Sequence, residues 1–283
     1  SHRLARQMGD LAVSNIGSVG TLPGINLQFL MELLAGLFLA SLRFGAFLIA
    51  SPFFGGSSTP LQVRIIMGII LGVAVVNNVP IPDWQSFSAL TGIQVIMTEL
   101  AIGIGSGLIL TIWFSAVLLA GEKIASSAGL GFAAQIDPDS GGQTPVVSKT
   151  FSLFLTVIFL SWNGHLVVLR AVADSYQFLP VGVMPNFPAL VQGGIAAAGS
   201  MFFAATIIML PLTAFLLAIN LVIGVMARSA PQLNLFSFGF PISMLGIFIL
   251  LFLWVDVLGG AMDDLSHTAS ENIQFVLGAM RDG

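Results

Sequence analysis

Hydrophobic side chains gather in six long blocks along the chain, and short polar or proline-containing stretches separate them. A helix needs about 20 apolar residues to cross the hydrocarbon layer of a membrane, and four of the blocks have the length of one such span. None shows the alternating pattern of barrel strands, so helices that satisfy their own backbone groups are expected throughout. The six blocks are Leu27–Ala50, Leu61–Val79, Phe87–Ala120, Phe151–Val172, Ile195–Met226 and Phe236–Leu258.

Two of the blocks are too long for a single upright span. Phe87–Ala120 contains four glycines, and Ile195–Met226 contains Pro211. Each block could form a tilted helix, a kinked helix or a hairpin, and the pattern leaves these alternatives open. Small residues four positions apart are expected to let helices approach closely; the pairs are Gly36 and Ala40, Gly103 and Gly107, and Gly194 and Ala198.

Composition agrees with a membrane location. Only 8% of the 283 residues are charged, whereas 56% are hydrophobic and the mean hydropathy is +0.99. The net charge of −4 provides no broad positive field for nucleic acid, and the absence of cysteine removes disulfides, thiolate metal sites and a cysteine nucleophile. These features disfavour a soluble enzyme, a disordered linker and a nucleic-acid binder, and they predict an all-α membrane protein.

The two ends of the chain differ from its apolar body. Residues 1–26 are expected to form a polar, flexible leader, residues 27–258 the body, and residues 259–283 an amphipathic tail. In the tail, Thr268 and Glu271 have the spacing of a capping box, which predicts the start of a short helix. This helix is expected to dock on a partner, lie at the membrane surface or simply end the chain; the residues on its apolar face are Ile273, Val276, Leu277 and Met280.

Seven charged residues lie inside the apolar blocks or at their rims. A charge at the bilayer centre costs about 2.5–3.5 kcal/mol on insertion scales, so most of these residues must face protein, water or headgroups. Residues near block ends can extend toward the headgroups, whereas Glu32 and Glu99 are expected either to contact another subunit or to be exposed at the interface. Lys and Arg are spread too evenly among the connections between the blocks to predict which side of the membrane each connection faces. The seven residues are Glu32, Arg43, Arg64, Glu99, Lys149, Arg170 and Arg228.

The longest internal polar stretch, residues 121–145, separates the third and fourth blocks and is rich in glycine. Loops of this length are usually functional or disordered. Asp137 and Asp139 invite comparison with a calcium site, but such a site needs about six to eight oxygens, and an Asp-Pro pair more often starts a turn. The stretch is therefore a candidate functional loop rather than a metal site.

Signatures of catalysis are missing from the sequence. It contains no GxxxxGK[ST], HExxH or GxSxG motif. The histidines, His2, His165 and His267, are too scattered for a metal site, and His165 is expected to be an interfacial side chain. We predict that the chain is not an enzyme and has no catalytic residues, no metal site and no cofactor.

Several short motifs occur in one order along most of the chain. The first group is Arg43-x-Gly45-Ala46, Pro52-Phe53-Phe54-Gly55 and Pro60-x-x-Val63-Arg64; the central group is Gly121-Glu122-x-Ile124, Gly129-Leu130-x-Phe132 and Asp137-Pro138; the last is Asn163-Gly164-His165, Leu179-Pro180-Val181-Gly182, Asn220-Leu221, Ala230-Pro231-Gln232-Leu233-Asn234 and Gly239-Phe240-Pro241. This series resembles the FliR/SctT family of type III secretion export-gate proteins, and the flagellar branch in particular.

The resemblance implies a core subunit of the flagellar export gate in the bacterial inner membrane, at the flagellar basal body. Its helical blocks, some of them kinked or folded as hairpins, would assemble helically with FliP and FliQ, with FlhB associated and membrane lipid around them. Unfolded flagellar export substrates would pass through the pore. The SctT-type injectisome subunit is the alternative within the family, and a secondary transporter or ion channel using Glu32 and Glu99 is an alternative outside it. A membrane scaffold with no passage of its own is a third.

The resemblance also implies roles for particular residues. The central loop would plug the closed pore, with Phe132 as its bulky gating side chain; the plug residues are Gly129, Leu130, Gly131, Phe132, Gln135, Asp137, Pro138, Gly141, Gly142 and Pro145. Candidate subunit contacts are Glu32, Arg43, Arg64, Glu99, Glu122, Arg228, Pro231, Gln232 and Asn234.

Overall fold

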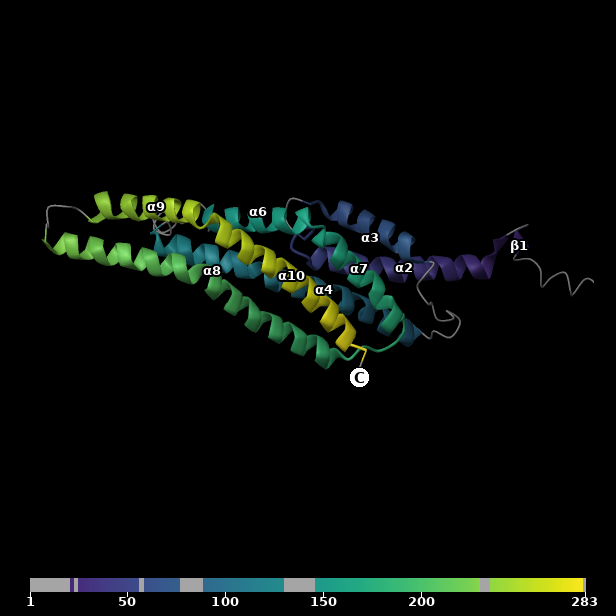
Figure 1. Cartoon of the computed structure of the whole chain (residues 1–283). Helices are drawn as coiled ribbons and strands as arrows, with labels where there is room; N and C mark the ends of the chain where they lie inside the picture. Colours follow the sequence, from purple (N-terminus) through teal and green to yellow (C-terminus); the bar gives the residue numbers. More distant parts are fainter. Residues whose placement is uncertain are drawn as a thin grey trace, which may run out of the picture.

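The protein is an elongated helical bundle in the computed structural model (Figure 1). The structure describes residues 21–22, 25–55, 59–76, 89–129, 146–229 and 235–281. Within these ranges, three helices are long and apolar enough to cross a membrane, and two bent helix pairs could raise that number to five. The prediction of an all-α membrane protein is confirmed.

The predicted leader lies largely outside the described residues. Its last part carries two short strands, β1 (Thr21–Leu22) and β2 (Ile25–Asn26), which pair antiparallel with Thr21 opposite Asn26. Helix α2 (Leu27–Ala50) follows directly and has the bounds of the first apolar block. The sequence pattern therefore predicted the first long helix correctly.

Helix α4 (Ala89–Ser127) packs against α2, α8 and α6, and α3 (Leu61–Val75) packs on α2. Glycine makes the α2–α4 contact close: a Cβ atom on Gly103 would lie 2.4 Å from the Arg43 carbonyl oxygen, and one on Gly107 would lie 2.8 Å from that of Phe47. The predicted close approach at this glycine pair is confirmed. Gly194 has open space at its Cβ position, so Gly194 itself makes no comparable close contact with the described residues.

Both overlong blocks form continuous helices rather than hairpins. Helix α4 has 39 residues and runs on through Glu122, so the polar stretch begins as helix and not as loop. Helix α8 (Phe187–Ser229) has 43 residues and contains Pro211. It changes direction along its length (Figure 1), as expected where proline removes a backbone hydrogen bond.

Two blocks expected to be single spans are instead broken. Helices α6 (Val146–Ser161) and α7 (Gly164–Phe178) meet at 68°, and α9 (Leu235–Leu253) and α10 (Val255–Ala279) meet at 66°. At the first break, Asn163 has a φ of 62°, a left-handed conformation that ends a helix. Hydropathy averaged over a window does not register such a break, because the short polar stretch at Asn163 is flanked by the apolar runs 151–160 and 166–169.

The C-terminal tail packs on its own chain. Helix α10 lies against α7, α4, α6 and α8, and its apolar face is buried; that face comprises Ile273, Val276, Leu277 and Met280. The predicted helix start at Thr268 is wrong, because α10 begins at Val255 and the Thr268 hydroxyl donates to the Asp264 carbonyl one turn earlier. The expected boundary between residues 258 and 259 therefore falls inside a helix.

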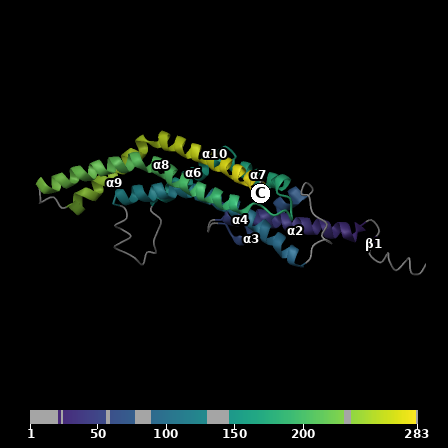
Figure 2. The same ribbon diagram turned by 90° about the horizontal axis from the view of Figure 1, so that it is seen from below.

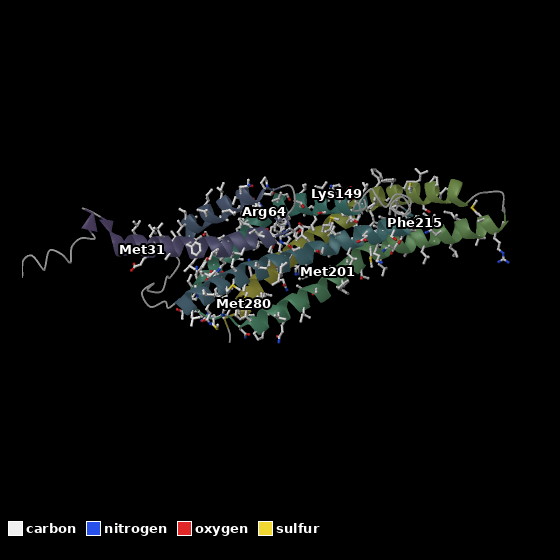
Figure 3. The ribbon with its side chains drawn as sticks, turned by 180° about the vertical axis from the view of Figure 1, so that it is seen from behind. Met31, Arg64, Lys149, Met201, Phe215 and Met280 are labelled. Carbon is white, nitrogen blue, oxygen red and sulfur yellow. The ribbon has the colours of Figure 1, made fainter. Side chains whose placement is uncertain are left out.

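An aromatic cluster joins the turn after α2 to the middle of the bundle. Phe53 stacks on Phe159 with ring centroids 4.5 Å apart and meets Phe114 edge to face at 4.6 Å. Trp162 extends the cluster to His267 on α10, with ring centroids 4.0 Å apart. The exposed side chains of Met31 and Phe215 lie toward opposite ends of the elongated molecule, with α8 continuing beyond Phe215 (Figure 3).

Candidate functional site

A buried ion pair connects α2 to α4. Arg43 is 0% exposed and Glu99 is 1% exposed. The guanidinium donates from Nε to Oε2 at 2.7 Å and from Nη2 to Oε1 at 2.9 Å. Such a two-bond geometry is the strong form of an arginine–carboxylate contact, and it allows both charges to lie inside the bundle.

Helix α7 completes the surroundings of Arg43. Its Nη1 donates to the Ser175 hydroxyl at 2.9 Å, and its Nη2 donates to the Leu179 carbonyl at 3.1 Å. The Tyr176 ring lies against the guanidinium, with Cζ 3.8 Å from the ring centroid. We call Arg43, Glu99, Ser175, Tyr176 and Leu179 the Arg43 cluster; it fastens three helices together.

The cluster changes the interpretation of Glu99. A contact with another subunit and exposure at the interface were the two expectations, and the structure shows a third arrangement, in which the partner is Arg43 of the same chain. Both carboxylate oxygens are engaged and the residue is buried. Glu99 and Arg43 are thus positioned to hold the fold rather than to meet a neighbouring molecule directly.

Ser175 and Tyr176 were not among the residues predicted from the sequence. Tyr176 is the only tyrosine of the chain, and its place just after an apolar block was the one available signal. Its hydroxyl donates to the Ala40 carbonyl at 3.4 Å, which adds a second link between α7 and α2. The spacing of these residues along the sequence carries no trace of this convergence.

The other predicted contact residues are distributed over four helices. Glu32 is half-buried on α2, Arg64 on α3 donates to the Thr59 carbonyl at 2.8 Å, and Glu122 and Arg228 are exposed on α4 and α8. The structure does not bring these four together at one site, and their role in subunit contact stays a prediction. Pro231, Gln232 and Asn234 lie outside the described residues.

Of the predicted plug residues, the structure describes only Gly129, which ends the last turn after α4. Its φ is 82°, a conformation that favours glycine, and its amide donates to the Ser126 carbonyl at 3.1 Å. The others lie outside the described residues: Leu130, Gly131, Phe132, Gln135, Asp137, Pro138, Gly141, Gly142 and Pro145.

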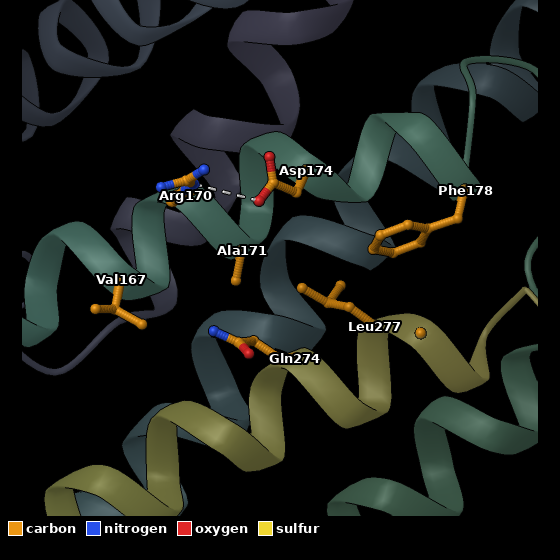
Figure 4. A pocket seen from close by; sticks show the side chains of 8 residues that line it. Val167, Arg170, Ala171, Asp174, Phe178, Gln274 and Leu277 are labelled. Carbon is orange, nitrogen blue, oxygen red and sulfur yellow. Dashed lines mark ion pairs between the residues drawn. The ribbon is translucent and has the colours of Figure 1, made fainter.

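A cavity of about 540 Å³ opens between α7 and α10 (Figure 4). Arg170 and Asp174 lie on its α7 side with 3.6 Å between Nε and Oδ2, and Gln274 and Leu277 face them from α10. The arginine side chain is 84% exposed, so this ion pair is screened by solvent. Across the described ranges, no three acidic or histidine side chains gather as a metal site would require.

Large apolar side chains are exposed along α3, α8 and α9. On α8 they extend from Phe187 to Met226, and no charged residue occurs between these two positions. Figure 2 shows that α8 and α9 together extend beyond the end of α4, as they do in Figure 1. The bundle therefore presents a long apolar surface that its own helices leave uncovered.

Comparison with known proteins places this architecture in a family. The family model for bacterial export proteins, family 1, matches residues 34–269. Flagellar biosynthetic protein FliR from Escherichia coli is 32% identical over 72% of this chain and 77% of its own length, and that from Aquifex aeolicus is 33% identical over 78% and 85%. The Bacillus subtilis protein of that name is 28% identical over 81% and 89%. This chain therefore belongs to the bacterial export proteins, family 1, alongside the FliR proteins that it matches over most of its length.

Proposed function

We propose that this chain is a core subunit of the flagellar type III protein export gate. With FliP and FliQ it would form the pore through which unfolded flagellar proteins leave the cytoplasm, in the inner membrane at the flagellar basal body and with FlhB associated. Membership of the export family and the flagellar names of the relatives support this proposal. No catalytic step is part of it.

The observation that carries the proposal is the apolar length of α8. Exposed apolar side chains from Val191 to Met226 cover about 50 Å at 1.5 Å per residue. The hydrocarbon layer is about 30 Å thick, and even a helix tilted by about 40° would use only some 40 Å of such a surface. Because lipid cannot cover the whole face, apolar surfaces of other subunits are the natural cover for the rest.

The stretch after Gly129 is the proposed plug. Backbone outside a helix is tolerated at membrane depth only where it is buried in protein or lines a cavity, and the inside of a multi-subunit pore meets that condition. Glycines would allow the stretch to be displaced by a passing chain, and Phe132 would supply bulk in the closed state. The left-handed Gly129 supports this proposal because it ends α4 where the stretch begins.

The transporter alternative depends on carboxylates within the membrane that bind substrate or protons. Glu99, one of its two candidates, has both oxygens occupied by Arg43. This pairing favours the export-gate proposal over the transporter. An injectisome subunit of the SctT type is the alternative within the family, and the flagellar names of the relatives favour the flagellar branch.

Secretion by the source bacterium tests the function. Removing this gene should abolish export of flagellar hook and filament proteins into the medium, and restoring it should recover that export. Secretion of injectisome substrates alone would instead assign the chain to the SctT branch. Normal flagellar export without the gene would contradict the proposal.

Resting ion conductance tests the plug separately. In cells with assembled complexes, deleting Gly131–Gly142 should raise conductance, whereas Lys123→Gln at the exposed surface of α4 should leave it unchanged. Equal conductance of the deletion variant and the parent would remove the plug from the proposal.

A further inference from the structure

A side-chain amide on α8 links three helices at the end of α4. The Asn220 Nδ2 group donates to the Ser127 carbonyl at 3.2 Å, and the Ser243 hydroxyl on α9 donates to Asn220 Oδ1 at 3.0 Å. Ser127 is the last residue of α4. We call Ser127, Asn220 and Ser243 the Asn220 clasp.

The clasp supplies a hydrogen-bond donor to a backbone carbonyl at the C-terminal end of α4. The last carbonyls of a helix have no partner within it and are usually satisfied by a glycine turn, a side chain or water. Here Gly129 closes the turn, with its amide bonded to the Ser126 carbonyl at 3.1 Å, while Asn220 satisfies the Ser127 carbonyl from a different helix. The end of α4 is thus fixed by contacts on two sides.

The chemistry of α8 makes an incidental contact a poor explanation. Between Phe187 and Met226 the helix has no charged residue, and Asn220 carries one of its few amide side chains. An amide in an apolar membrane helix is costly unless it is hydrogen-bonded. Asn220 is exposed on this chain, and it uses one N–H donor and its acceptor oxygen between helices, so part of the cost of the amide in an apolar helix is offset by a defined geometry.

The clasp lies where α8 and α9 begin to extend past the end of α4. Because Asn220 lies level with the end of α4, the remainder of α8 up to Ser229 and the start of α9 project past it (Figures 1 and 2). Helix α9 packs mainly on α8. The clasp is therefore one hydrogen-bonded link between the α8–α9 hairpin and the end of α4, in addition to the packing of α8 on α4 and α10.

We propose that Asn220 is a positioning residue. From the α8–α9 hairpin it binds the last carbonyl of α4, so that the position of the hairpin and the position of the α4 C-terminus depend on each other. Its significance for export rests on the proposed function, because the proposed plug continues from this point. The coupling itself requires only the three described helices. A displacement of the α8–α9 hairpin by a partner would then be transmitted to the end of α4.

Amide hydrogen exchange in the purified complex tests the clasp without any assay of transport. Asn220→Leu removes both hydrogen bonds and replaces the amide by a side chain of similar size. Hydrogen exchange at the amides of Ala128 and Gly129 should then become about 3- to 15-fold faster, which corresponds to the usual strength of interhelical hydrogen bonds in membranes. Ser243→Ala leaves the bond to Ser127 and should have a smaller effect. Thr206→Val is the matched control, since among the described residues this α8 hydroxyl donates to the Phe202 carbonyl of its own helix and not to another helix.

Unchanged exchange in Asn220→Leu, or an equal increase in Thr206→Val, would overturn the proposal. Cysteine cross-linking covers the case in which Asn220→Leu fails to assemble, because the chain has no cysteine of its own. The pair Ile219→Cys and Gly246→Cys leaves Asn220 and Ser243 in place and should be joined by a short thiol cross-linker, because a Cβ atom on Gly246 would lie 2.6 Å from Ile219 Cδ1. Ile219→Cys with Ser229→Cys, about 15 Å apart along α8, should not be joined. Failure to join the first pair would contradict the clasp.

The clasp and the plug fail in different ways. If deletion of Gly131–Gly142 leaves conductance unchanged, the plug is excluded while the exchange result still decides the clasp. If that deletion raises conductance but Asn220→Leu changes neither exchange nor conductance, the plug stands and the clasp is excluded.

Discussion

Arg43 and Glu99, 56 positions apart in the sequence, meet through two hydrogen bonds of 2.7 and 2.9 Å inside the bundle. Each residue alone would be costly in this environment, because a buried charge without a partner loses its hydration. Together they tie α2 to α4, and Ser175 extends the link to α7. The chain therefore satisfies its most deeply buried charges internally, before any other subunit is present.

Glu99→Ala should destabilise the fold strongly, because it leaves the Arg43 guanidinium buried without a counter-charge. Breaking one side of such a pair costs about 3–5 kcal/mol. Thermal unfolding of the purified complex, followed by helical circular dichroism, should show a clear decrease in midpoint, and less complex should be recovered. Replacing both residues, as Arg43→Met with Glu99→Leu, should cost less than the single change.

The exposed ion pair on α7 supplies the matched control. Arg170→Ala breaks a contact of 3.6 Å whose arginine is 84% exposed, and such pairs contribute about 0–1 kcal/mol. A midpoint for Glu99→Ala no lower than that for Arg170→Ala would contradict the importance of the Arg43 cluster.

Sequence patterns were sufficient for elements whose cause is local. The bounds of α2 follow from a single apolar run, and the close packing at Gly103 follows from small residues at helical spacing. The break at Asn163 was missed because it depends on one left-handed residue, and the turn signal of the Asn163-Gly164 pair was outweighed by the apolar runs around it. The capping-box pattern at Thr268 gave a wrong helix start. Its hydroxyl donates to the Asp264 carbonyl in the interior of a continuous helix instead of capping the start of a new helix.

The candidate site was harder to predict because its contacts join distant positions. Arg43 and Glu99 were both identified as charged residues within apolar blocks. The sequence contains no signal that these two residues contact each other. Asn220 was noticed only as part of a family motif, since its partners lie 93 and 23 positions away. Pairings of this kind follow from how helices pack, which hydropathy alone does not specify.

Gly103→Ala should separate α2 from α4. Its new methyl group would lie 2.4 Å from the Arg43 carbonyl oxygen, which is backbone and cannot rotate away. Overpacking of this kind costs about 1–3 kcal/mol, and the shift would also disturb the Arg43 cluster. Thermal unfolding of the purified complex measures the loss.

Gly92→Ala on the same helix provides the comparison. Its Cβ position has no atom within 4 Å, so the change should be neutral or stabilise α4 by about 0.5–1 kcal/mol through helix propensity. Equal unfolding midpoints for the two alanine variants would contradict the role of Gly103 in the close α2–α4 contact.

Ile273→Ala should weaken the attachment of α10 to the bundle. The side chain is fully buried among helices of its own chain, and large-to-small changes in a core cost about 2–5 kcal/mol. Limited proteolysis of the complex should then release the C-terminal region faster. Phe275→Ala, at a position that is 74% exposed, should leave the cleavage rate unchanged, and equal rates for both variants would argue against docking of the tail on its own chain.

We propose, as the core of the function above, that this chain forms part of the wall of an export pore built from several kinds of subunit. Affinity purification of the tagged chain from the membranes of its own bacterium, in a mild detergent and followed by native mass spectrometry, tests that claim most directly. We predict that FliP and FliQ are retained in one stable complex with it. Recovery of the chain as a folded, solitary protein from cells that contain both and export flagellar proteins normally would contradict the account.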